Sequence, residues 1–171
     1  SLISTAERRL LMSGEAKTSI RMSDFLGIIA AINGKVELVY EGEQEGAEQI
    51  AFHLINQAVK TLFPSYFPEL KKLEKQDEDG PYDRLLGWFY GDNELFLEDS
   101  LPDDVYRDTL DAVPNLNTLV STHQPKSLSE DKYFLMEFLL WGLEANKRLN
   151  KYRTLEGFQF KDGLGNLLAG L

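Results

Sequence analysis

The chain has 171 residues, with 18 Lys and Arg against 28 Asp and Glu, and it has no cysteine. The net charge of −10 opposes general affinity for nucleic acid or for an anionic membrane. The lack of cysteine excludes disulfides and thiolate chemistry from this sequence and is typical of a reducing compartment. We therefore expect a cytoplasmic protein with neither a nucleic-acid nor a membrane partner.

Two helices are predicted at the start of the chain. The first covers 2–13, with Ser4 or Thr5 as its cap and Gly14 as a left-handed stop. The second is capped by Ser23, continues through an apolar run and ends at 33–34, where Asn and Gly follow each other. Residues 35–40 then read as a short strand or an extended linker.

The stretch VYEGEQEGAEQ, 39–49, is strongly acidic and lies between two apolar segments. From 47 onward the apolar residues follow the period of one helical face, and Pro64 is expected to end that helix. Glu45 and Glu48 fall near its first turn, where a carboxylate contributes about 0.3–1 kcal/mol. The acidity is thus explained in part by a helix start, without a metal or another ligand.

The middle of the chain is expected to contain a β-hairpin. Residues 67–75 read as a short helix and 76–80 as a charged turn. Aromatic residues at 88–90, a Gly-Asp-Asn turn at 91–93 and a second apolar run at 94–97 then predict strand, turn and strand.

The last third is predicted to be mainly helical. Pro102 opens a helix that reaches about Val113, Pro114 closes it, and 115–123 form another short helix. The strongest pattern, 130–149, is apolar on nearly every face, so it should lie at the centre of the core. The glycine-rich segment 157–171 is expected to be a loosely attached tail.

Few residues have the spacing of a known catalytic or metal site. The phosphate-binding loop G-x-x-x-x-G-K-[ST] is absent from the sequence. His53 and His123 lack a second ligand at a metal-binding spacing, and the QDEDG turn before Pro81 fails as a calcium loop at both ends. We predict no catalytic, cofactor-binding or metal-binding residue in this sequence.

Charge is distributed unevenly along the second half of the chain. An acidic run over 92–111 is followed by a basic cluster over 147–153, near the predicted end of the long helix. A solvated surface is the ordinary explanation, and docking of a basic partner or of a neighbouring subunit is the alternative. The candidate partner-binding residues are Asp92, Asp99, Asp103, Asp104, Asp108, Lys147, Arg148 and Lys151.

Several segments in order resemble the region after the ATPase core of AAA+ proteins of the magnesium chelatase subunit I and MoxR-like group. They are STAERRLLMSGE, then IRMSDFLGIIAAINGKVEL, then VYEGEQEGAEQIAFHLINQAVKTLF. WFYGDNELFLEDS and EFLLWGLEANKRLNK are similar to the aromatic hairpin and closing helix of a C-terminal extension in that group.

The resemblance implies three parts: the end of a helical lid at 1–38, a mostly helical accessory domain at 39–156 and the tail at 157–171. The fold class is then mainly α, a helical lid remnant followed by a helical domain with one small β-hairpin. The chain would be a non-catalytic fragment of a homo-oligomeric ring ATPase that binds ATP and Mg elsewhere and acts on an unknown protein client. In the lid-like part, Arg8, Arg9 or Arg21 would reach a neighbouring subunit or, more ordinarily, form surface ion pairs.

Two other functions remain open from the sequence. The chain is alternatively a stand-alone acidic protein-interaction module, or the C-terminal part of a sigma-factor-interacting AAA+ transcriptional regulator. The regulator would require a basic recognition helix beyond the lid. The most basic helix end here follows a stretch too apolar and aromatic for a DNA groove.

Overall fold

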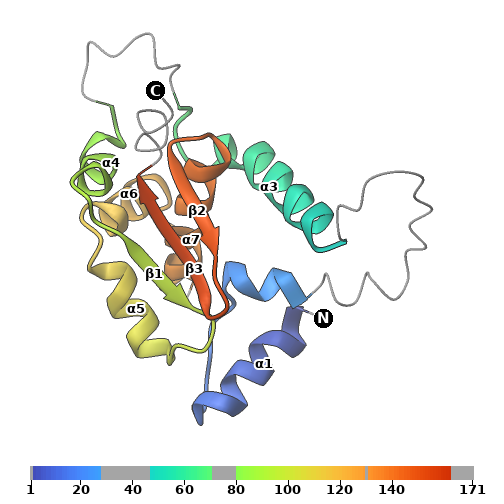
Figure 1. Ribbon diagram of the computed structural model, residues 1–171. Helices are drawn as coiled ribbons and strands as arrows, with labels where there is room; N and C mark the ends of the chain where they lie inside the picture. The colour runs from blue at the N-terminus through green and yellow to red at the C-terminus, as the bar shows by residue number, and fades with distance from the viewer. Residues whose placement is uncertain (1, 28–46, 71–79, 130, 163–171) are drawn as a thin grey trace, which may run out of the picture.

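The computed structural model describes residues 2–27, 47–70, 80–129 and 131–162. Over these residues the fold is mainly helical and includes a small three-stranded antiparallel sheet (Figure 1). This confirms the predicted fold class. The predicted strand or linker at 35–40 lies outside the described residues. So does 39–46, which is most of the acidic stretch 39–49.

The N-terminal segment consists of a helix and a single tight turn of helix. Helix α1 spans Leu2–Ser13, and Gly14 follows it with a φ of 70°, as its predicted role as a left-handed stop requires. The 3-10 helix η1 spans Met22–Phe25. Its cap is Arg21 rather than the predicted Ser23, because the Arg21 N–H donates to the Asp24 carboxylate at 2.8 Å.

Helix α3 spans Ala47–Tyr66 and continues past the predicted end at Pro64. A proline removes one N–H donor and its ring crowds the carbonyl four residues earlier, so near the end of a helix the loss is limited to the last turn. Burial of Phe63 and the bond from Phe67 N to Phe63 O, at 3.0 Å, keep this turn helical. The short helix predicted at 67–75 is wrong for 67–70, which are irregular, and 71–75 lie outside the described residues.

Helix α4 spans Asp83–Tyr90 and occupies the place of the first strand of the predicted hairpin. The buried residues Leu85, Leu86 and Phe89 have helical spacing, and this period overrides the strand preference of the aromatic run at 88–90. The second predicted strand does exist, as β1 over Leu95–Glu98. The hairpin was therefore predicted in the wrong place.

The sheet is built from segments far apart in the sequence. Strand β2 spans Leu149–Arg153 and β3 spans Gly157–Asp162, and the strand order is β1-β3-β2. The predicted tail is thus wrong for Gly157–Asp162, which form the central strand, with Phe158 and Phe160 buried. The rest of the predicted tail, 163–171, lies outside the described residues.

Gly157 allows the close approach of β3 to β1. A Cβ at this position would lie 2.7 Å from the Cα of Glu98 and closer still to the Leu97 carbonyl oxygen. Both atoms belong to the backbone, so the strands must separate to admit a methyl group. We expect Gly157→Ala to lower the free energy of unfolding by about 1–3 kcal/mol in urea denaturation.

Gly87, inside α4, provides the matched control. A Cβ there would have no neighbour within 4 Å. Gly87→Ala is expected to raise stability by about 0.5–1 kcal/mol, because alanine restricts the unfolded chain more than glycine. Equal effects of the two substitutions would contradict the steric role of Gly157.

Helix α7 forms the centre of the core, as predicted. It spans Asp131–Ala145 and ends before the predicted 149, because Leu149 begins β2. Every residue from Leu135 to Leu143 is buried, including Glu137. In Figure 1 the sheet lies in front of α7, and α3 runs alongside. The predicted helices α5 (Asp103–Asp111) and α6 (Leu116–His123) are confirmed.

Helix α3 packs closely on α7 at Gly142. A Cβ there would lie 3.0 Å from Cγ of Phe63 and closer still to the edge of the ring. The Phe63 ring therefore fills the space that any larger residue at 142 would need. This contact joins the first half of the chain to the central helix.

Candidate functional site

The predicted acidic docking residues divide into paired and free carboxylates. Asp99 pairs with Arg153 at 2.6 Å, and Asp103 pairs with Arg107 at 2.6 Å. Asp104 and Asp108, by contrast, are exposed on α5 and form no ion pair with a described residue. Asp92 lies on the turn between α4 and β1, with a φ of 61°. The free acidic surface is therefore smaller than the sequence indicates.

The predicted basic cluster does not lie on the end of a helix. Lys147 follows α7 with a φ of 60°, and Lys151 lies on β2. The Lys151 side chain is only 6% exposed. Its ammonium pairs with Glu144 at 2.9 Å, donates to Asn56 Oδ1 at 3.1 Å and lies 3.3 Å from the centre of the Trp141 ring. The Lys151 charge is therefore engaged within the fold rather than presented at the surface.

A buried polar network holds α1 against η1. Arg9, only 6% exposed, forms an ion pair with Asp24, which is 1% exposed. The other terminal nitrogen of Arg9 donates to Thr18 Oγ1 at 3.3 Å and to the Ser19 carbonyl. Burial of two charges is costly unless they meet each other and their hydrogen bonds are made. The position of α1 is therefore set by charge pairing as well as by packing.

The same network continues from η1 into the body of the fold. Arg21, 1% exposed, donates to the Leu101 carbonyl at 2.7 Å and lies 4.1 Å from the centre of the Tyr106 ring. Met22 N donates to a Glu137 carboxylate oxygen at 2.9 Å. The Tyr106 hydroxyl donates to the same oxygen at 2.8 Å. Glu137 on α7 thus joins η1 to α5.

Asp103 provides a second link between the N-terminal segment and α5. The Ser19 hydroxyl donates to its carboxylate at 2.7 Å, and its own backbone N–H donates to Glu15 at 2.7 Å. Burial opposes ionisation of this group, but the Ser19 hydrogen bond and the Arg107 charge prevail and lower the pKa of Asp103. The Asp103 carboxylate is therefore already paired within the fold.

Burial shifts the ionisation of the groups at the centre of the network. It raises the pKa of Glu137, although the hydrogen bonds from Met22 and Tyr106 act in the opposite direction. Burial, with the nearby Glu137 charge, also raises the pKa of Tyr106. Burial, followed by the charge of Arg9, lowers the pKa of Arg21. The carboxylate of Glu137 is therefore costly to keep charged.

This shift predicts a pH dependence of stability. Because the pKa of Glu137 is higher in the folded than in the unfolded chain, its contribution is fully present below the unfolded value of about 4.3. The contribution is lost as the pH rises through the raised pKa. We expect the unfolding free energy of the wild type, minus that of Glu137→Gln, to fall as the pH rises from about 4 to 7 in urea denaturation.

A glutamine at 137 keeps an oxygen that can accept from Met22 N and from the Tyr106 hydroxyl. Glu7→Gln, on the exposed side of α1, is the reference variant. A wild-type minus Glu137→Gln difference that stays flat or increases with pH would contradict the raised pKa.

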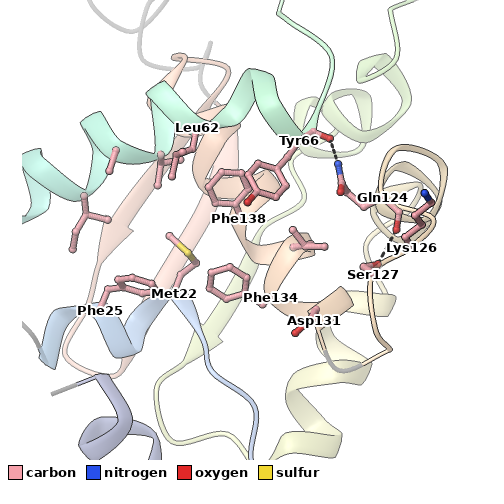
Figure 2. A pocket seen from close by; sticks show the side chains of 14 residues that line it. Met22, Phe25, Leu62, Tyr66, Gln124, Lys126, Ser127, Asp131, Phe134 and Phe138 are labelled. Atoms are coloured by element: carbon pink, nitrogen blue, oxygen red, sulfur yellow. Dashed lines mark hydrogen bonds between the residues drawn. The ribbon is translucent and has the colours of Figure 1, made fainter.

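An apolar groove of about 520 Å³ lies between α3 and α7, with η1 along one side (Figure 2). Phe25, Tyr66, Phe134 and Phe138 contribute aromatic rings to it. At the mouth, Leu62 is 50% exposed and Tyr66 is 40% exposed. At one end Gln124 donates its side-chain N–H to the Tyr66 carbonyl at 2.7 Å. The groove is large enough for apolar side chains or a small apolar ligand.

Among the described residues, neither histidine belongs to a group of side chains that could hold a metal ion. His53 is exposed on α3, and the ring of His123 packs edge-on against Phe67, with centroids 6.4 Å apart. Over the described ranges, no three His, Cys, Asp or Glu side chains are grouped so that they could hold a metal ion. Of the QDEDG turn at 76–80, the structure describes only Gly80.

The sequence indicated only part of the buried network. Arg9 and Arg21 were predicted to form surface ion pairs or to reach a neighbour, and both are instead buried. Arg8 does lie on the surface. One signal was present for Glu137, because a single carboxylate interrupts the apolar run at 133–143 and must be buried with it. Nothing local indicated that its partners would be Met22 and Tyr106.

Within the described part of the chain, none of the helices has the length and apolar character needed to cross a membrane. Comparisons with protein-family models, with curated proteins and with solved structures find no match to this chain.

Proposed function

We propose that this chain is the non-catalytic C-terminal region of a cytoplasmic AAA+ ATPase resembling magnesium chelatase subunit I or a MoxR-like protein. In this proposal the parent assembles as a homo-oligomeric ring, binds ATP and Mg upstream and remodels a protein client or assists metal insertion. The described region couples the end of the helical lid to the surface that meets the client or the next subunit. The proposed contact includes the exposed carboxylates Asp104 and Asp108.

The observation that carries this proposal is the buried polar network between the predicted lid remnant and the accessory domain. In the first part, Arg9 pairs with Asp24. From there, Arg21 donates to the Leu101 carbonyl, and Met22 N donates to Glu137. Glu137 also accepts from the Tyr106 hydroxyl in the second part. Buried hydrogen-bonded charges restrict the relative positions of the elements that carry them, because a displacement leaves a charge unpaired. A rotation of α1 would therefore be transmitted to α5 and α7 instead of being absorbed at a loose joint.

The experiment uses the longer protein encoded by the reading frame that contains this chain. We expect an upstream phosphate-binding loop and measurable ATP hydrolysis. Replacing Arg9 by Met together with Asp24 by Leu removes both charges of the central ion pair, so neither is left buried without the other. ATP hydrolysis without client should persist in this variant, whereas stimulation of hydrolysis by the client, or ring assembly, should fall by about 10-fold.

The matched control is Glu7→Gln, which lies on α1 outside the network and should leave both activities unchanged. A reading frame without a nucleotide-binding loop would refute the ATPase parent and favour the stand-alone interaction module. Full client coupling in the double variant would refute the coupling role alone. Sequence-specific DNA binding by the same protein would favour the sigma-factor-interacting regulator.

A further inference from the structure

A second cavity, of about 450 Å³, lies where four parts of the chain meet. Helix α1 contributes Arg8, Arg9 and Met12 to its wall, and η1 contributes Ser23. The link after β1 contributes Ser100, and the β2–β3 hairpin contributes Arg153 and Leu155. None of these residues lines the apolar groove, and among them only Arg9 belongs to the polar network. The cavity therefore needs a separate explanation.

The wall of this cavity carries more positive than negative charge, in a chain whose net charge is −10. It contains three guanidinium groups and the two carboxylates of Asp24 and Asp99. Both carboxylates form ion pairs, Asp24 with Arg9 and Asp99, through Oδ2, with Arg153, while Asp99 Oδ1 has no hydrogen-bond partner among the described residues. Arg8 is exposed and has no ion-pair or hydrogen-bond partner among the described residues. Its charge is therefore available to an anion.

Two hydroxyl groups add neutral donors to the same wall. Neither Ser23 Oγ nor Ser100 Oγ forms a hydrogen bond with a described residue. A guanidinium group together with hydroxyl groups is a suitable donor set for an oxyanion, because the guanidinium presents fixed N–H groups and a hydroxyl rotates to meet an oxygen. A charged oxygen accepts a stronger hydrogen bond from a guanidinium than a neutral oxygen does, so the set favours an anion.

The rim of the cavity is apolar. Met12 is 69% exposed, and Leu155, at the tip of the β2–β3 hairpin, is fully exposed. A fully exposed leucine beside a cationic cavity has apolar surface that an apolar group of a ligand would cover. The cavity is also larger than a lone phosphate ion requires, since a water molecule occupies about 30 Å³ of liquid.

We propose that this cavity binds a small organic oxyanion, a phosphate monoester or carboxylate attached to an apolar group. Arg8 pairs with the charged oxygens, Ser23 and Ser100 donate hydrogen bonds to them, and Met12 and Leu155 cover the apolar part. The ligand bridges α1 and the β2–β3 hairpin, two segments distant in sequence. This site is independent of the proposed ATPase parent, because all its residues lie within the described chain.

The probe is phenyl phosphate. Inorganic phosphate, which carries only the charged group, and benzyl alcohol, which carries only the ring, are the comparison ligands. Binding is measured by NMR titration of backbone amides in this 171-residue chain. We expect saturable binding of phenyl phosphate, weaker binding of inorganic phosphate, and shifts centred on Ser23, Ser100 and Leu155. Arg8→Gln should weaken phenyl phosphate binding about 10-fold or more, the usual effect of losing a charged hydrogen bond.

The control is Arg84→Gln, which removes another exposed arginine, on α4, outside the cavity wall. Leu155→Ser tests the apolar half and should weaken phenyl phosphate while leaving inorganic phosphate unchanged. Both Arg8 and Leu155 are exposed, so neither change should unfold the chain. Absence of saturable binding by phenyl phosphate, or equal affinities of Arg8→Gln and Arg84→Gln, would overturn the proposal.

Discussion

Asp24→Ala is expected to release α1 from the rest of the fold and to lower the free energy of unfolding by about 3–5 kcal/mol. The carboxylate accepts from Arg9 and, at 2.8 Å, from Arg21 N. Its removal leaves the guanidinium of Arg9 buried without an opposite charge, and leaves the Arg21 N–H without its acceptor. Urea denaturation measures the global loss, and amide hydrogen exchange shows whether α1 opens first.

The companion variant removes both charges. Arg9→Met with Asp24→Leu should regain the part of the loss that comes from the unpaired Arg9 charge, while the Arg21 N–H still lacks its acceptor. Glu7→Ala, an exposed acidic position on α1, is the matched control and should cost less than about 1 kcal/mol. A loss for Asp24→Ala no larger than the loss for Glu7→Ala would show that the ion pair does not hold α1.

Trp141→Ala is expected to lower the free energy of unfolding by about 3–5 kcal/mol. The indole is 0% exposed in the middle of α7, and its ring meets Phe158 of β3 edge-on at 5.1 Å. Truncation leaves a large cavity between the central helix and the sheet. It also removes the ring nearest to the Lys151 ammonium, which then keeps Glu144, Asn56 and the more distant Phe158 ring at 5.9 Å.

The second tryptophan of the chain provides the comparison. Trp88 is half-buried on α4, where it meets the Phe89 ring at 4.9 Å. Trp88→Ala therefore removes less buried surface, and thermal or urea unfolding should show a clearly smaller loss than for Trp141→Ala. Trp141 Nε1 has no hydrogen-bond partner among the described residues, so Trp141→Phe should keep most of the stability. Equal losses for the two alanine variants would contradict the central position of Trp141.

Helices could be predicted well where their signals are local. The bounds of α1, the left-handed Gly14 and the start of α5 at Pro102 follow from caps, breakers and a period of 3.6 residues. The same signals failed at Pro64, because the loss caused by a proline near the end of a helix is limited to the last turn. They also failed at 88–90, where aromatic residues favour a strand but the spacing of buried residues favours a helix.

The candidate sites were less predictable than the helices. Asp99 and Asp103 looked like part of a free acidic surface, and Lys151 like part of a basic one. In the structure Asp99 pairs with Arg153, and Lys151 pairs with Glu144. Asp103 pairs with Arg107 and accepts from the Ser19 hydroxyl. Asp99 meets Arg153 only because β1 and the β2–β3 hairpin lie together. Charge counts along the chain therefore overestimated the surface available for docking.

The sequence by itself determined the helical class, the central position of α7 and the lack of cysteine chemistry, because composition and periodicity act between near neighbours. Only the tertiary structure decided that Gly157–Asp162 is the middle strand and that Arg9, Arg21 and Glu137 share one buried network. Those outcomes depend on contacts between residues distant in sequence. Strand pairing and the burial of a charge are both decided by the partner that the fold brings to each residue.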